Sequence, residues 1–377
     1  MKTISRLRYF LYLSILIVGC TTGKNALQKG NYDASVSKAV DRLKSAPKNE
    51  EAKQVLASAY ELALNNHLRR IEEAKLSSDV LRWESILADY QQINQLANEI
   101  NACPTCLTLV PTPKKFITEV EESKYKAAEV RYASGTKLMG ENNRLSAKKA
   151  YYDFERAQQL YPSFKDVKTK IDDAYWAAVL KVVVQPVQIR SSFYQLSNQY
   201  FEQQVNAFIS NYQRNKFVLF YSEKQADEQN IIADQVLNLS FDDFIVGQTY
   251  VKERVEKLKR DSVIIGQTRN NKPVYGTVKA TLSFFDKKVS SSGSLFMTIS
   301  DWRTNKVIKQ RSLTGTYVWQ DRWSSYKGDD RALTAQQLKM TAKREVMPPA
   351  PGFLFTEFTK PIYAQLVDEI SYFYNQY

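Results

Sequence analysis

The spacing of apolar residues changes once along the chain, near residue 181. Before this point, apolar residues recur every three to four positions and glycine and proline are sparse, which is typical of amphipathic helices. After it, β-branched and aromatic residues alternate with polar ones, which favours strands. A chain of 377 residues is also long for one core. We therefore predict an α+β protein, with an all-α domain over 28–180 and an α/β sandwich-type domain over 181–377.

The second domain should contain an antiparallel meander and a closing helix. The predicted strands are 181–190, 217–221, 235–246, 274–285, 293–301 and 307–318, with turns at 286–292 and 303–306. The predicted helices are 192–213, 224–232 and 359–374, with Pro361 in the first turn of the last one. Residues 250–261 (YVKERVEKLKRD) fit either a helix face or an elongated strand, and the pattern leaves both open.

Residues 1–19 have the parts of a secretory signal. A basic flank precedes the apolar segment 9–18, which is too short for a spanning helix of about 20 residues. The sequence 17–20, Ile-Val-Gly-Cys, resembles the lipobox of bacterial lipoproteins. The resemblance implies cleavage before Cys20, lipid on that cysteine and a short tether over 20–27, because several acyl chains give the stable anchoring that one chain does not.

The same resemblance gives an expected location. No aspartate follows Cys20, which favours the outer membrane, and no acidic run follows it either, which favours a body in the periplasm. The expected partners are the membrane through the lipid anchor, other envelope proteins and, as a further candidate, peptidoglycan. Beyond the signal segment the chain holds 50 basic and 40 acidic residues. This charge looks evenly spread, and nucleic acid is not an expected partner in this compartment.

Two cysteines remain, Cys103 and Cys106, in the sequence NACPTC. In an oxidising compartment they could form a small disulfide or act as a redox dithiol. A redox pair should open a helix beside a strand, whereas this pair lies between helical stretches, so we favour a structural disulfide. With His67 as the sole histidine and no second CxxC, four-ligand zinc is not expected.

The helical half contains a repeated pattern. Small and aromatic residues precede Pro47 and Pro162, and in both places a tyrosine follows the proline by thirteen residues, Tyr60 and Tyr175. Residues 25–64 and 125–178 therefore resemble tetratricopeptide repeats, whose stacked helix pairs form a concave surface for partner proteins. The resemblance breaks over 65–122, where 66–76 and 78–101 indicate longer helices. We expect an irregular array, with a plain helical bundle as the alternative.

Short motifs of the second half carry another resemblance. They are "AD-x-V-L" at 233–237 and "D-x-x-T-N-x-V-I" at 301–308. With the order of strands and helices, they resemble the domain shared by the curli secretion-channel lipoprotein, the penicillin-binding-protein activator lipoproteins and the amino-terminal domain of the Tol-system propeller protein. The resemblance covers about 180–320 and the last helix. It implies a fold, and function must be argued from a site.

A search for catalytic residues gives little. His67 lies in a charged helical stretch and is predicted to face solvent, so no Ser-His-Asp triad can be assembled around it. The carboxylates Asp242, Asp243, Glu253 and Asp261 could supply an acid and a base only if folding brought two of them together. We expect no catalytic residue, no metal and no cofactor.

The candidate binding segment is a long loop predicted over 321–352. Aromatic residues beside aspartate and arginine have the composition of interface anchors, and long loops are often functional. The predicted partner-binding residues are Trp319, Trp323, Tyr326, Asp329, Asp330 and Arg331. In the alternative interpretation, which is compatible with the first, the two tryptophans finish the last strand and cap the core.

The sequence therefore predicts a lipid-anchored, non-enzymatic adaptor or assembly subunit of an outer-membrane complex that acts through protein-protein interaction. One alternative is an oligomeric component of a secretion channel. The other is a carboxylate-dependent enzyme that binds or hydrolyses glycans.

Overall fold

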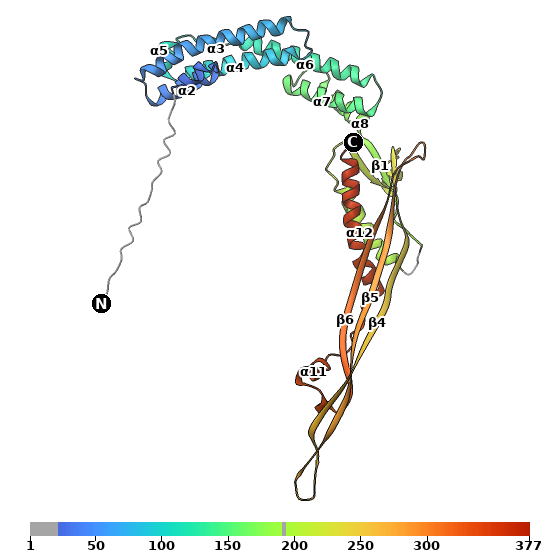
Figure 1. Ribbon diagram of the computed structural model, residues 1–377. Helices are drawn as coiled ribbons and strands as arrows, with labels where there is room; N and C mark the ends of the chain where they lie inside the picture. Colours follow the sequence, from blue (N-terminus) through green and yellow to red (C-terminus); the bar gives the residue numbers. More distant parts are fainter. Residues whose placement is uncertain (1–21, 191–193) are drawn as a thin grey trace, which may run out of the picture. The chain divides into compact units, whose positions relative to one another are not determined.

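The computed structural model describes residues 22–190 and 194–377 and divides into two compact units between Ala178 and Val179 (Figure 1). The predicted signal segment 1–19 and the predicted lipid site Cys20 lie outside the described residues. Among the residues that are described, no helix combines the length and the apolar character needed to cross a membrane.

The first unit is entirely helical. Its helices are α1 (Lys24–Gln28), α2 (Tyr32–Ser45), α3 (Glu50–Leu76), α4 (Arg82–Asn101), α5 (Pro104–Leu109), α6 (Ile117–Met139), α7 (Arg144–Leu160) and α8 (Val167–Ala178). Asparagine begins three of them, because the side-chain oxygens of Asn31, Asn49 and Asn143 accept hydrogen bonds from backbone N–H groups three residues further on.

The two predicted repeats each contain a helix hairpin. Pro47 lies between α2 and α3, and Pro162 lies between α7 and α8. The prediction of a separate helix over 66–76 is wrong, because α3 runs unbroken for 27 residues. No helix-breaking residue interrupts it, and its buried positions Ala63, His67 and Ile71 continue one face at a spacing of four.

The second unit is a mixed sheet with helices. Its strands are β1 (Leu180–Val184), β2 (Gln188–Ile189), β3 (Val218–Ser222), β4 (Gln235–Gln267), β5 (Pro273–Asp301) and β6 (Val307–Gly328). Its helices are α9 (Gln195–Ser210), α10 (Glu223–Glu228), η2 (Asp330–Ala332), α11 (Ala335–Met340) and α12 (Pro351–Tyr374). The sheet order is β3-β1-β4-β5-β6, with β2 beside β4. The β4-β5-β6 part is an antiparallel meander, so the predicted α+β class is confirmed.

The meander strands are much longer than predicted. The turn expected at 286–292 is wrong, because β5 continues through it with β4 on one side and β6 on the other. Serine and glycine are weak strand formers, and pairing on both edges overrides that local preference. Residues 250–261 likewise belong to β4. The turn at 303–306 is confirmed, with the Asp301 carboxylate accepting the Thr304 N–H at 2.8 Å.

The closing helix also begins earlier than predicted. Helix α12 starts with Pro351 at its first turn, so Pro361 lies in the helix interior and not at its start. The extra turns bury Leu354, Phe355 and Phe358 in the core. We attribute the longer helix to this burial, which offsets the backbone hydrogen bond lost at Pro361.

Helices α9 and α12 cover one face of the sheet and form its main core. Phe201 and Val205 of α9, with Phe358 of α12, pack there against Phe241 of β4 and Leu295 of β5. The smaller α10 packs with β1 through Ala226 and Val183. Beyond this core the meander continues without α9 and α12, and α11 lies beside it (Figure 1).

This extension has two parts, the ribbon and the return segment. The ribbon is residues 248–290 of β4, β5 and their turn, with 316–328 of β6. The return segment is 329–350, which includes η2 and α11 and leads into α12. Residues 321–328, predicted as loop, are strand.

Glycine at position 315 allows α12 to approach the sheet. A Cβ atom at Gly315 would collide with the carbonyl oxygen of Phe358 and lie 2.8 Å from Cγ1 of Ile362. We expect Gly315→Ala to lower the free energy of unfolding of the sheet unit by about 1–3 kcal/mol, the usual effect of overpacking. Urea denaturation followed by far-UV circular dichroism measures this.

The matched control is Gly266→Ala in β4, where an added Cβ atom would meet nothing within 4 Å. Its free energy of unfolding should stay close to that of the parent chain. Equal stability of the two variants would contradict the close approach of α12 at Gly315.

Candidate functional site: a basic ribbon and its groove

The excess positive charge is concentrated on one part of the chain. Residues 248–290 and 316–350, the ribbon with the return segment, contain 16 lysine and arginine residues and 8 aspartate and glutamate residues. All other described residues together contain 34 and 32. The even spread expected from the sequence is therefore wrong. The sequence order hides the clustering, because β-pairing brings the two segments together.

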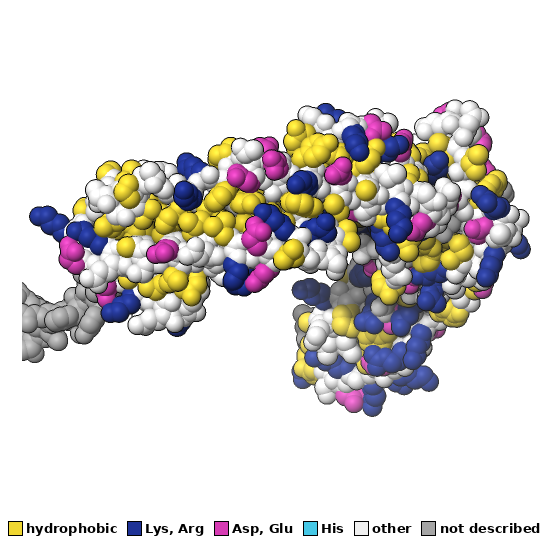
Figure 2. All heavy atoms as spheres, turned by 90° about the horizontal axis from the view of Figure 1, so that it is seen from above, with side chains coloured by type: hydrophobic (Ala, Val, Ile, Leu, Met, Phe, Trp, Pro, Cys, Tyr) yellow, Lys and Arg dark blue, Asp and Glu magenta, His cyan; other side chains and the backbone are white. Residues whose placement is uncertain are grey.

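The surface shows the same contrast between the two units. In Figure 2, lysine and arginine side chains gather on the sheet unit, whereas hydrophobic side chains form a band along the helical unit. A concentrated positive field attracts anionic partners and speeds their association.

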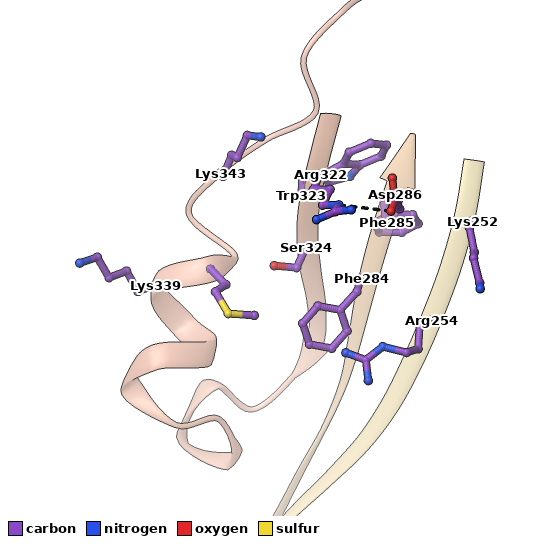
Figure 3. A pocket seen from close by; sticks show the side chains of 11 residues that line it. Lys252, Arg254, Phe284, Phe285, Asp286, Arg322, Trp323, Ser324, Lys339 and Lys343 are labelled. Atoms are coloured by element: carbon purple, nitrogen blue, oxygen red, sulfur yellow. Dashed lines mark hydrogen bonds and ion pairs between the residues drawn. The ribbon is translucent and has the colours of Figure 1, made fainter. Parts of the chain in front are cut away.

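A groove of about 590 Å³ lies on the ribbon where α11 approaches the strands (Figure 3). Three strands and the return segment supply its lining, which is Lys252, Arg254, Phe284, Phe285, Asp286, Arg322, Trp323, Ser324, Lys339, Met340 and Lys343. Five of these side chains are cationic and one is a carboxylate. The groove thus combines an apolar, aromatic interior with a positive rim.

Phe284 and Arg254 point toward one another in the groove (Figure 3). The Arg254 guanidinium lies 4.4 Å from the centre of the Phe284 ring, a cation–π distance, and it also contacts Glu256 at 2.6 Å. Phe284 further packs against Leu282 in a small cluster that includes Leu333 of the return segment. The groove floor is therefore part of the packing that attaches the return segment to the ribbon.

The single carboxylate of the groove, Asp286, is already paired. Gln320 donates a hydrogen bond to it at 2.6 Å and Arg322 lies 3.2 Å away. The Gln320 hydrogen bond, with the charge of Arg322, lowers the pKa of Asp286 below its ordinary value. Asp286 thus stays ionised while it holds Arg322 in place.

Two cations of the rim have no partner of this kind. Lys252 of β4 and Lys339 of α11 are exposed, and no carboxylate of the described chain lies within ion-pair distance of either one. Lys343, by contrast, contacts Asp321 at 2.5 Å. Lys252 and Lys339 are therefore the charges that remain available to a ligand.

The predicted aromatic anchors lie on β6 and not in a loop. Trp323 stacks on Phe285 with ring centres 5.0 Å apart and planes 12° apart. Because successive strand residues point to opposite faces of a sheet, the Phe285 and Trp323 rings lie on the face opposite to the Phe284 side chain. Trp319 is paired with Val289, and Tyr326 is exposed. The tryptophans thus lie within β6, as the alternative interpretation expected, but they are not part of the main core, and Trp323 also lines the groove.

Two of the predicted polar residues of the loop, Asp329 and Arg331, contact each other. The Asp329 carboxylate accepts hydrogen bonds from Arg331, which lower its pKa to about 2. Arg331 also donates to the carbonyl oxygen of Ile264 at 2.5 Å and so ties η2 to β4. Asp330 is the first residue of η2 and lies beside this pair.

Sequence reasoning missed Lys252, Arg254, Phe284 and Lys339 as groove residues. The available signal was the density of cations over 250–261. That signal does not identify the partners from β5 and α11, since these are brought in by pairing and by packing.

Asp321 holds the return segment against the ribbon. This buried carboxylate of β6 accepts hydrogen bonds from Lys343 at 2.5 Å and from the Val346 N–H at 2.8 Å. The hydrogen bond from Lys343 is the largest of the causes that lower the pKa of Asp321. Beside it, Lys287 of β5 contacts Glu345 at 2.6 Å. These contacts position the segment that carries Lys339 and Lys343.

His67 is buried, so the prediction that it faces solvent is wrong. Its side chain is 3% exposed, with Nδ1 2.7 Å from Asp89 and Nε2 3.0 Å from Asp33. Arg70 adds a contact of 3.3 Å to Asp89. The charged neighbours in the sequence concealed a position on the buried face of α3. His67 therefore links α2, α3 and α4 and is not available for catalysis at the surface.

Cys103 and Cys106 form a disulfide at the start of α5. Both are buried, at 1% and 0% exposure, in a core that includes Leu43 and Leu56. This burial favours the structural role predicted for the disulfide over a redox role.

Three of the candidate acid and base residues, Asp243, Glu253 and Asp261, lie far apart. Asp243 and Glu253 are ten residues apart on β4, and Asp261 is eight further on. At about 3.3 Å per residue these separations are roughly 33 and 26 Å, against about 5–9.5 Å in glycoside hydrolases. The side chain of Asp242 is outside the description. Over residues 22–190 and 194–377, no group of three histidine, cysteine or acidic residues is placed to hold a metal.

No protein-family model matches this chain, and no curated protein matches it either. Solved structures show a distant likeness. One is described as a neuraminyllactose-binding hemagglutinin homolog from Helicobacter pylori, at 12% identity and a TM-score of 0.24 over 52% of this chain and 90% of that one. Another is the protein CT253 from Chlamydia trachomatis, at 12% identity and 0.24 over 51% and 96%. At these scores the likeness carries no functional argument.

The ion pairs of His67 make stability depend on pH. The hydrogen bond to Asp33, with smaller contributions from Asp89, raises the pKa of His67 above 6.5 despite its burial. Its contribution to stability is therefore fully present below the unfolded pKa and is lost as the pH rises through the folded pKa. We expect the free energy of unfolding of the helical unit to fall as the pH rises above about 6.5 and through the raised pKa of folded His67.

Urea titrations at several pH values, followed by circular dichroism, measure this dependence. The variant His67→Gln should have a flatter profile over the same range, since it has no group that titrates there. A profile with the same slope in both proteins would contradict the role given to His67.

The Asp321 contacts predict a local effect. Asp321→Asn weakens the hold on Lys343 and Val346, so the return segment should open more often while the core stays folded. We expect faster trypsin cleavage after Lys343 and Arg344, measured by mass spectrometry of the fragments. Asp286→Asn is the matched control, because Asp286 contacts only ribbon residues. Equal cleavage rates in the two variants would contradict the holding role.

Proposed function

We propose that this protein is a lipid-anchored, non-enzymatic adaptor or assembly subunit of a bacterial outer-membrane complex, with its body in the periplasm. The observation that carries the proposal is the basic ribbon, which extends past the core of its unit and bears most of the excess charge. A chain gains little core burial from such an extension. Contact with a partner is a better explanation for the presence of this extension.

Exposed apolar residues on the ribbon add support. Tyr250, Val251 and Val255 of β4 are each more than half exposed, and Val318 of β6 is 55% exposed. Apolar side chains among cations also occur on surfaces that protein partners bury, so these residues are compatible with a contact role for the ribbon.

The two resemblances support the same class of function. Helix hairpins of the tetratricopeptide type serve as peptide-binding and protein-binding scaffolds. The resemblance of the second half to curli-channel and synthase-activator lipoproteins favours work in an envelope assembly. The lipobox at 17–20 would hold both units at the membrane where such assemblies form.

Cross-linking in cells tests the proposal. A tag at the carboxyl end, cross-linking of whole cells and purification in mild detergent should recover one defined set of envelope proteins. Cys20→Ser removes the lipid site, and we expect it to lose that set, since the partners would no longer be concentrated beside the chain. The measurement is quantitative mass spectrometry of the eluates.

A second comparison guards against loss of expression. The two proteins should be equally abundant in whole-cell immunoblots. Recovery of the same partners with Cys20→Ser would contradict the anchored part of the proposal. Clean recovery of the tagged protein alone, in both strains, would contradict the adaptor part.

A further inference from the structure

We infer that the groove on the ribbon binds an extended acidic segment of a partner polypeptide, with one apolar side chain of that segment placed on Phe284 and Met340. This inference rests on the proposed adaptor function and names the chemistry of the partner. Its site is the groove of Figure 3, where β4, β5, β6 and α11 meet.

The rim of the groove selects for negative charge. Arg254, Arg322 and Lys343 are fixed by contacts with Glu256, Asp286 and Asp321. Lys252 and Lys339 have no such contact in the described chain. They lie on different elements and on different sides of the groove (Figure 3). Carboxylates spaced along a ligand could reach both.

The interior of the groove selects for an apolar group. The Phe284 ring forms part of the lining, and Met340 of α11 contributes a flexible thioether that is 39% exposed. Methionine adapts to ligand side chains of differing shape, and its sulfur contacts aromatic rings favourably. The volume of about 590 Å³ lies within the range of ligand pockets and is ample for one large side chain.

The strand beside the groove favours an extended ligand. From Asp243 to Gln267, β4 pairs with β5 on one edge, and no described strand pairs with the other edge. Extended peptides bind such an edge through their main chain. The five lysine and arginine residues of β4 over 248–267, which outnumber its three acidic residues there, oppose pairing with another copy of this chain through like-charge repulsion. The same residues favour an acidic strand.

A compact phosphate group fits the groove less well than an acidic peptide. Phosphate sites use converging backbone N–H groups at a glycine-rich turn or a helix start. The lining here comes from strand interiors and from the end of α11 with Lys343 beyond it, and the first turn of α11 is closed by a capping box in which Thr334 and Gln337 satisfy each other. The cations are separated around the rim and do not converge on one point.

Fluorescence anisotropy tests the inference. The probe is a short fluorescein-labelled peptide of alternating glutamate and serine with one central phenylalanine, titrated with the full chain bearing Cys20→Ser. We expect saturable binding that weakens as salt rises. The double variant Lys252→Glu and Lys339→Glu should weaken binding by about ten-fold or more, because both available charges are reversed.

The matched control is the double variant Lys257→Glu and Lys327→Glu. These residues flank Thr281 in the same ribbon, on the face opposite to Phe284, and their reversal changes the net charge equally. The control should alter affinity by less than about two-fold. Replacing the central phenylalanine of the probe with serine should weaken binding to the parent chain.

Three outcomes would overturn the inference. Equal losses in the two double variants would show a general charge effect. Unchanged binding in the groove variant would place the peptide elsewhere. Absence of peptide binding, together with binding to phosphatidylglycerol vesicles that the groove variant loses, would identify a lipid site.

The peptide-binding experiment and the cross-linking experiment can contradict their proposals independently of each other. If the envelope complex is recovered and also survives Lys252→Glu with Lys339→Glu, the adaptor function stands and the groove assignment falls. If the peptide binds in the groove while cells yield no complex, the groove chemistry stands and the adaptor function falls.

Discussion

The sheet unit depends on one constraint, which is that β5 is paired along both of its edges. Its register with β4 runs from Asp301 back to Pro273, and its register with β6 runs from Ser300 back to Ala280. A strand in this position has its backbone N–H and C=O groups satisfied by neighbours. The meander can therefore continue past the core without a hydrophobic layer of its own, which two strands alone would scarcely sustain.

The ribbon is attached to the core in two different ways. Near the core, Gly293 and Gly315 allow α12 to lie directly on the strands. Further out, the return segment is held by Asp321 and by a small apolar cluster around Leu282 and Leu333. Because the return segment leads into α12, its path links the outer ribbon to the helix that closes the core. The groove lies along that path, so its shape follows from the attachment.

In the helical unit, polar contacts between helices take the place that long strand pairing has in the sheet unit. His67 joins Asp33 and Asp89, and Glu84 of α4 binds Arg131 of α6 and Arg156 of α7. His67 connects α3 to the helices before and after it in the chain, whereas Glu84 connects α4 to α6 and α7, which do not follow it directly. His67 and Asp89 are buried and the Glu84 group is partly buried, and charges removed from water are costly unless paired. Their pairing therefore specifies which helices meet.

Features that depend on neighbouring residues could be predicted from the sequence. The change of period near residue 181, the helix hairpins around Pro47 and Pro162, and the turn at 303–306 all follow from local preferences of the backbone. Features that depend on distant residues could not be predicted in this way. The continuity of β5 through its serines, the burial of His67, the clustering of charge on the ribbon and the groove around Phe284 each require a register or a packing partner many residues away. A sequence pattern reports what a segment prefers by itself, whereas pairing on both edges of a strand, or a buried carboxylate beside a histidine, can reverse that preference. The tertiary structure decided these points because it alone brings the partners together.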